Sequence, residues 1–291
     1  MSEDNTNTPG SGKPDGEGKA STSLVLAVVI VVVIVIAGIA SAIVLRDRNS
    51  DSGSTAPTTS AVRPTVPRPS GTAGEFGTPE IDEFGRRVDV PADPAGQPLP
   101  QTGAQRKPGD PDWLTGAPAG TRDKGGWQRV GAGEVVPFST SDGPTRVVDG
   151  VASGYAHTPQ GAALAAAYVV WRISAEPGNK ALWEHALLTT PADMDRYTSE
   201  RAAGRLPDTL PGDMGKLLRA FDAFRVTSFS EDLAVVELAM RSEPDSSGSP
   251  RWATMRLPMH WDGADQMWRL KPFFGKPPLT PVSSLSGWTT W

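Results

Sequence analysis

The stretch 157–174, HTPQGAALAAAYVVWRIS, decides how this chain folds. Thr158 is a favourable helix N-cap, and Pro159 suits the first helical position, where its missing N–H leaves no bond unmade. The spacing predicts a helix that runs to about Ser174. The small residues at 161–167 allow this helix to pack closely against a sheet. Its expected apolar face comprises Leu164, Ala165, Tyr168 and Trp171.

The elements that follow this helix indicate the fold class. A second helix is expected over about 180–188, and Thr190-Pro191 repeats the cap signature to open a third helix that ends near Ala203. From Arg219 onward the apolar pattern changes to a period of two. The four strands expected there cover 219–229, 233–241, 251–261 and 266–270. Helices followed by an antiparallel meander predict an α+β fold.

The last two strands are expected to form a hairpin across the turn 262–265, DGAD. Alternation assigns the first of them two faces. The core face is predicted to hold Ala253, Met255, Leu257, Met259 and Trp261. The opposite face holds Trp252, Thr254, Arg256, Pro258 and His260. Because Pro258 cannot donate a hydrogen bond, it favours an edge position or a bulge for this strand.

A 22-residue apolar run, LVLAVVIVVVIVIAGIASAIVL at 24–45, lies far upstream of these elements. A helix of this length spans roughly 33 Å, which matches a hydrocarbon core of about 30 Å. A signal peptide is the alternative, but the run is too long for one and continues past the small residues at 40–42. We therefore expect a retained transmembrane helix and a single-pass cell-membrane protein. The basic residues on its two sides are nearly balanced, so they do not set the orientation.

Composition divides the rest of the chain. Residues 1–23 are predicted to be a disordered cytoplasmic tail, and 46–126 a Pro/Gly/Ser-rich stalk and extended arm. The body, 127–275, is expected to be an extracytoplasmic α+β domain, followed by a Pro-rich, Trp-containing tail at 276–291. The later part of the arm is either linker or a segment that docks on the body or on a neighbour. The residues considered for docking on a partner are Arg86, Arg87, Trp288 and Trp291.

The sequence contains no local signature of catalysis or of cofactor binding. Cysteine is absent, and the three histidines share no metal-ligand spacing. No nucleophile elbow, P-loop or dinucleotide motif occurs. The net charge of −5 comes from 28 basic and 33 acidic residues without a basic stripe, which argues against direct nucleic-acid binding. We therefore expect no enzyme, no catalytic residue, no cofactor and no metal.

A pattern of several blocks resembles an uncharacterised family. The block GYAHTPQGAA at 154–163, the upstream FGRRVDVPADPAGQPLPQ at 84–101 and the later WDG…WRL resemble single-pass membrane proteins of actinobacteria associated with conjugative or integrative elements. The order of elements also looks like the scaffold subunits of type IV secretion systems. Those subunits have the nuclear transport factor 2-like cone, in which a curved antiparallel sheet wraps a long helix. The second likeness is one of architecture alone.

Three functions follow as hypotheses. The first is a non-enzymatic structural or assembly component of a conjugative, type IV-like transfer apparatus. Its expected partners are the membrane, other membrane or secretion-apparatus proteins and further copies of the chain. The second is a ligand-binding or enzymatic cone, whose pocket or core would be lined by Tyr168, Trp171, Trp183, Phe224, Phe229 and Trp252. The third is a cell-envelope sensor.

Overall fold

A computed structural model describes residues 76–272 and 279–291. The expected cytoplasmic tail, the apolar run at 24–45 and the first part of the stalk lie outside these residues. Within the described part of the chain, no helix is both long enough and apolar enough to cross a bilayer. The fold there is α+β, with one large antiparallel sheet and few helices.

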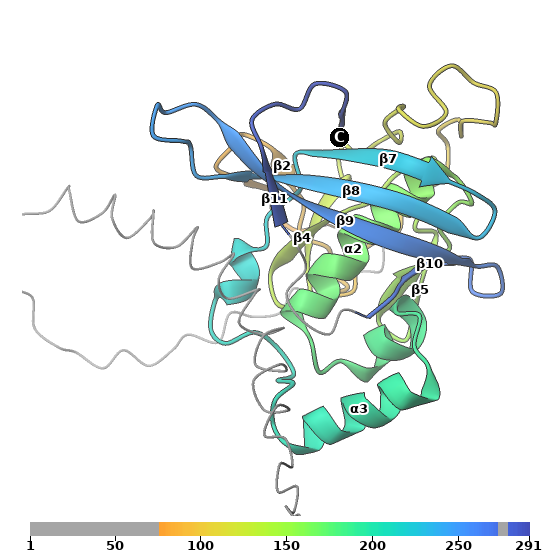
Figure 1. Cartoon of the computed structure of the whole chain (residues 1–291), viewed down its shortest axis with the longest axis vertical. Helices are drawn as coiled ribbons and strands as arrows, with labels where there is room; N and C mark the ends of the chain where they lie inside the picture. Colours follow the sequence, from red (N-terminus) through yellow and green to blue (C-terminus); the bar gives the residue numbers. More distant parts are fainter. Residues whose placement is uncertain (1–75, 273–278) are drawn as a thin grey trace, which may run out of the picture.

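The main sheet has six strands in the order β10-β9-β8-β7-β12, with β11 also paired to β9 (Figure 1). Its strands are β7 (Ala223–Phe229), β8 (Leu233–Ser242), β9 (Arg251–Asp262), β10 (Met267–Leu270), β11 (Leu279–Val282) and β12 (Thr289–Thr290). The predicted meander therefore forms the centre of the sheet. The C-terminal segment adds one short strand on each side.

The predicted hairpin of β9 and β10 is confirmed, and its register places Trp268 opposite Trp261. Met255, Leu257 and Met259 of the predicted core face are buried, as the alternation predicted. Ala253 and Trp261 of that face are only partly buried, and Thr254 of the opposite face is buried, where its hydroxyl donates to Thr280 O of β11. The expected edge position was wrong, because β9 pairs with β8 on one side and with β11 and β10 on the other. Pro258 is tolerated because it falls between the stretches that pair with β11 and β10.

The direction of the backbone at Pro258 explains this further. The N–H of Trp261 donates to Asp232 O on the β8 side. Successive N–H groups of a strand point to alternate sides, so position 258 points away from β8. Proline thus stands where the described strands leave its nitrogen without an acceptor.

Helix α2 (Pro159–Ala175) packs beneath the main sheet (Figure 1). Thr158 is its N-cap, since its hydroxyl accepts from Gly161 N at 3.0 Å. The sequence predicted one buried face, but only Ile173 and Ser174 escape full burial. The second side is covered by a hairpin of β3 (Trp127–Val130) and β4 (Glu134–Pro137), which packs on α2.

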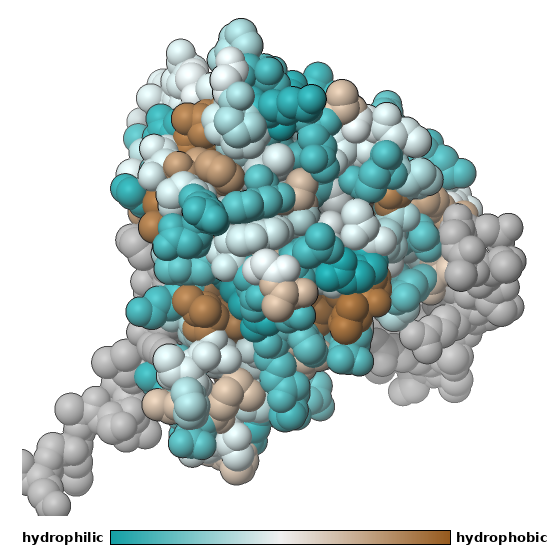
Figure 2. Space-filling view, turned by 90° about the vertical axis from the view of Figure 1, so that its right-hand side faces the viewer, coloured by the Kyte–Doolittle hydropathy of each residue, from teal (hydrophilic) through white to brown (hydrophobic). Residues whose placement is uncertain are grey.

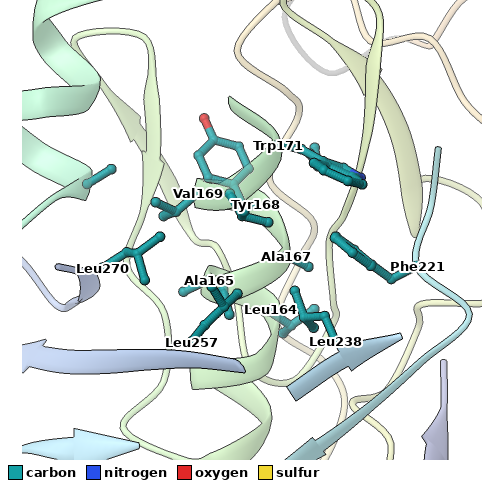
Figure 3. Close-up of a cluster of buried hydrophobic side chains, with 14 of the residues drawn as sticks. Leu164, Ala165, Ala167, Tyr168, Val169, Trp171, Phe221, Leu238, Leu257 and Leu270 are labelled. Carbon is teal, nitrogen blue, oxygen red and sulfur yellow. The ribbon is translucent and has the colours of Figure 1, made fainter. Parts of the chain in front are cut away.

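Figure 3 shows the contact between α2 and the sheet. Leu238 and Leu257 come from the strands and lie next to Leu164 and Ala165 of the helix. Trp171 stacks on Phe221 with ring centroids 4.6 Å apart (Figure 3). The small residues of α2 thus allow a close approach, as expected from the sequence.

The remaining helices are short or peripheral. Helix α3 (Pro191–Ala202) starts where Thr190-Pro191 predicted, and Thr190 and Asp193 form a capping box there. The helix expected over 180–188 is only a π-helical turn, η1 (Leu182–Ala186). It stops because the chain becomes extended at Leu187, and the next residue donates its N–H to Leu270 O of β10. The other short elements are the 3₁₀ turn η2 (Met214–Leu217) and the hairpin of β5 (Arg146–Val148) and β6 (Val151–Ser153).

The arm at 76–126 packs on the body. Its hairpin pairs β1 (Glu80–Ile81) with β2 (Arg87–Val88). Asp89 then bridges to Gln128 of β3, and its buried carboxylate accepts from Arg87 and from Gly125 N. Burial alone would raise the pKa of Asp89, but these hydrogen bonds hold it below its usual range. This part of the arm therefore docks on the body, which was one of the two alternatives considered for it.

The C-terminal residues fold back onto the same domain. Trp291 is 5% exposed and its ring lies 4.5 Å from that of Phe224 and 5.6 Å from that of Trp127. Arg122 of the arm donates to the Trp291 carbonyl. Trp288 lies under the guanidinium of Arg225. Both tail tryptophans thus have partners within their own domain.

Candidate functional site: a pocket lined by arginines

A small pocket lies where the arm meets the end of the main sheet. It combines three segments that are far apart in the sequence: the β1–β2 turn, the approach to β7 and the end of β8. The residues that line it are Phe84, Leu217, Arg219, Ala220, Asp222, Met240 and Arg241. Its lining combines apolar side chains with the charged side chains of Arg219, Asp222 and Arg241.

The β1–β2 turn presents Phe84 to the pocket. Asp82 Oδ1 accepts from Phe84 N at 3.0 Å and from Arg86 N at 2.8 Å, which fixes the backbone of the turn. Gly85 adopts a φ of 79°, a value that glycine reaches without steric cost. The Phe84 side chain remains 40% exposed. A hydrogen-bonded turn thus presents a large apolar ring at the surface.

Two guanidinium groups contact this ring. The guanidinium carbon of Arg219 lies 5.3 Å from the Phe84 ring centroid, and that of Arg241 lies 4.9 Å away. Arg241 also lies 5.7 Å from the ring centroid of Trp252. Within the described residues, Arg241 makes these two ring contacts but no ion pair, whereas Arg219 contacts the carboxylate of Glu83. Cation–π contacts of this kind orient a guanidinium without neutralising its charge.

One partly buried carboxylate, Asp222, lies among the arginines. Its Oδ2 accepts from Arg241 N at 2.7 Å, and its Oδ1 lies 3.7 Å from Arg86 Nη2. Burial raises the pKa of Asp222, and the charges of Arg86, Arg241 and Arg219 oppose that rise. The carboxylate thus interacts with the charges of three arginines, and within the described part of the chain the hydrogen bond that it accepts comes from a backbone N–H.

Arg86 completes the cluster. Its guanidinium lies over Trp127, 4.9 Å from the ring centroid, and its Nη1 is buried without a hydrogen-bond partner. Burial lowers the pKa of Arg86, and the charges of Asp222 and Asp82 counteract this. An orphaned N–H donor of a cation indicates a site short of acceptors. Arg86 itself does not line the pocket, and the carboxylates Asp82 and Asp222 already act on its charge.

The residues predicted for a ligand pocket lie elsewhere. Tyr168, Trp171, Trp183 and Phe224 are buried in the core, and Phe229 and Trp252 are partly buried. Trp171 Nε1 donates to Arg219 O, and Trp183 Nε1 donates to Pro177 O. None of the six lines the arginine pocket. Their contacts are those of core residues.

Sequence reasoning identified only part of the pocket. Of the four residues considered for docking, only Arg86 belongs to the arginine cluster, because Arg87 binds Asp89 and the two tail tryptophans pack on their own domain. The sequence did not indicate that Phe84, Arg219 and Arg241 form a group. An apolar residue within the charged stretch 82–87, DEFGRR, was the one local signal.

Two further polar clusters are structural. Ser141, Asp142 and Thr158 form a fully buried network before α2. Arg172 of α2 pairs with Glu134 at 2.8 Å and with Glu176 at 2.9 Å. Among the residues that the structure describes, no group of three or more His, Cys, Asp or Glu could hold a metal ion.

The described residues form an α+β domain with a small pocket where the arm meets the main sheet. The family described as a domain of unknown function, DUF8175, matches residues 89–290, and the chain belongs to that family. The match begins in the arm and ends in β12, so it includes the body and the C-terminal segment that pairs with the main sheet. Comparisons with curated proteins and with solved structures found no match.

Proposed function

We propose that this protein is a non-enzymatic, single-pass membrane protein that acts as a structural or assembly component of a conjugative, type IV-like transfer apparatus. In this proposal residues 24–45 span the membrane, the tail at 1–23 is cytoplasmic and the body lies outside the cytoplasm. The observation that carries it is a membrane-length apolar run upstream of one α+β domain. The finer fold belongs to the proposal, namely a nuclear transport factor 2-like cone with α2 beneath a curved sheet.

Two features of the body support a role in protein assembly. The arginine pocket combines the exposed Phe84 ring with Arg219 and Arg241, and Trp252, which does not line the pocket, contacts Arg241 from outside it. Trp and Arg are enriched at interface hot spots. Figure 2 shows small apolar patches separated by polar residues on one face. A partner of that face would be recognised at discrete positions rather than through a broad apolar surface.

The proposal is tested by deletion and crosslinking. An in-frame deletion of the gene should lower the frequency of conjugative transfer of the element that encodes it. A photo-crosslinking residue at Ile81, which is 68% exposed and close to Phe84 in the chain, should recover transfer-apparatus proteins from intact cells. Unchanged transfer together with no such crosslink would refute the proposal.

A matched crosslinking site controls for chance encounters. Ala192 is exposed on α3, and Figure 1 shows this helix on the other side of α2 from the main sheet. A crosslinker at Ala192 should not recover the same proteins. Equal recovery from both positions would contradict an interface near the pocket.

A further inference from the structure

We infer that the β1–β2 hairpin, residues 77–88, is an electrostatic latch, which docks on the body through ion pairs and lengthens the chain upstream of the body when it is released. Ionic strength controls the release, because carboxylates of the hairpin contact arginines of the body. The release is a property of the domain itself. Its consequence for the reach of the body rests on the proposed membrane anchor at 24–45.

The first argument is the charge at the contact between hairpin and body. Glu80 of β1 lies 2.7 Å from Arg129 Nη2 of β3, and Glu83 of the turn contacts the guanidinium of Arg219. The side chain of Glu80 is 49% exposed and that of Glu83 is 47% exposed. Ion pairs that are this exposed contribute little each, and added salt weakens them further.

The charges at the turn are complementary in the same way. Arg86 of the hairpin lies 3.7 Å from Asp222 Oδ1 of the body. The charge of Asp82 acts on both Arg86 and Arg219, and Glu243 of the body also acts on Arg219. The junction is thus a contact between complementary charges of two parts of the chain.

The second argument is how little apolar surface the hairpin buries. Both residues of β1 are exposed, and Ile81 is 68% exposed. The Phe84 ring is 40% exposed and lies against the guanidiniums of Arg219 and Arg241. Burial of apolar surface is the main favourable term in protein association. The hairpin has little of this term to keep it docked when its ion pairs are screened.

The third argument is the point at which close packing begins. Val88 and Asp89 are fully buried. Asp89 N donates to Trp127 O, and Arg129 N donates to Asp89 O, so this residue is bonded to β3 in both directions. The family match also begins at residue 89, so the hairpin lies outside it. The boundary at 88–89 is the hinge of the latch.

The fourth argument is the geometry of the chain. Gly77 N donates to Val90 O at 2.8 Å, so the docked hairpin brings its two ends together. A two-stranded hairpin alone is marginally stable in water, so this hairpin opens once it leaves the body. Residues 77–88 then add up to about 40 Å to the upstream link, at roughly 3.3 Å per residue.

Hydrogen exchange of the full-length chain in detergent tests the latch. The amides of 77–88 should exchange about tenfold faster at about 500 mM than at about 50 mM potassium chloride, because their ion pairs are screened. The amides of β8 and β9 should not change. No acceleration in the hairpin, or the same acceleration in β8 and β9, would overturn the inference.

Substitutions separate charge from packing. Glu80→Gln combined with Glu83→Gln should give fast exchange in the hairpin already at low salt, and salt should then change the rate by less than about threefold. The matched control, Glu184→Gln combined with Asp208→Asn, removes two exposed ion pairs elsewhere and should leave the hairpin unchanged. Phe84→Ala should accelerate exchange but keep the salt dependence. A full salt effect in the first double variant would contradict the role of the ion pairs.

Spin labels measure the opening of the hairpin. The chain has no cysteine, so Ile81→Cys and Ala192→Cys place two labels at exposed positions of the hairpin and of α3. The narrow distance distribution expected at low salt should become broad at high salt. A distribution that stays narrow would show that the hairpin remains docked and would contradict the latch.

The latch and the proposed function fail separately. If salt releases the hairpin but deletion of the gene leaves conjugative transfer unchanged, the latch stands and the assembly role fails. If deletion lowers transfer but the hairpin stays docked at high salt, the assembly role stands and the latch is wrong.

Discussion

Leu257 shows how one side chain of the sheet supports the core. It is fully buried on the face of β9 that packs on α2 (Figure 3). Leu257→Ala should lower the free energy of unfolding by about 2–5 kcal/mol, because it removes buried methyl groups and leaves a cavity. His260→Ala, three residues along the strand and only partly buried, should cost less than about 1 kcal/mol. Urea denaturation measures both, and the reverse ranking would contradict the assignment of faces.

Glu134 makes stability depend on pH. Burial raises its pKa from 4.5 to about 7, although Arg172 opposes the rise. The folded protein thus holds this proton more tightly than the unfolded chain does. The stability contribution is fully present below about pH 4.5 and is lost as pH rises through about 7.

The Glu134→Gln variant tests this expectation, because glutamine does not titrate. The unfolding free energy of the natural protein minus that of the variant should fall between pH 5 and pH 8. Glu184→Gln is the control, since Glu184 forms an exposed pair with Lys180. It should change stability little at either pH. A difference for Glu134→Gln that stays constant or grows with pH would contradict the raised pKa.

At the scale of elements, the N-cap of α2 is expected to contribute more to the free energy of unfolding than the N-cap of α3. The Thr158 hydroxyl caps α2 and also donates to Asp142 Oδ1 at 2.7 Å in a buried network. Thr158→Ala should therefore cost about 2 kcal/mol, because it removes the cap and leaves a buried acceptor unpaired. Thr190→Ala removes the exposed cap of α3 and should cost about 1 kcal/mol. Thermal melts that show equal shifts would mean that the buried network adds nothing.

At the scale of the whole molecule, the orientation in the membrane follows from the proposed anchor at 24–45. Protease added to intact protoplasts should degrade the body and leave an epitope at the N-terminus protected. Protoplasts permeabilised with detergent should lose both signals. A protected body in intact protoplasts would reverse the proposed orientation.

The core of the domain is completed by segments from both ends of the described part of the chain. Trp291 packs between Trp127 of β3 and Phe224 of β7, and Arg122 of the arm donates to its carbonyl. Helix α2 is thereby enclosed by the sheet, the β3–β4 hairpin and the segments that join them. The arm and the C-terminal residues are thus parts of one core.

The sequence by itself determined the local features of this protein. Thr158-Pro159 and Thr190-Pro191 located two helix starts, because capping depends on residues a few positions apart. Alternation from 251 to 261 set the two faces of β9, because side chains of a strand point to opposite sides in turn. The α+β class followed from the order of these elements.

Only the tertiary structure decided the features that need distant segments in contact. The η1 turn replaced a predicted helix because Leu188 hydrogen-bonds to β10, and α2 was buried all round because the β3–β4 hairpin covers its second side. The pocket likewise joins Phe84 of the arm to Arg219 and Arg241. No local pattern encodes such a contact, because its free energy arises only after the chain has closed loops of more than a hundred residues.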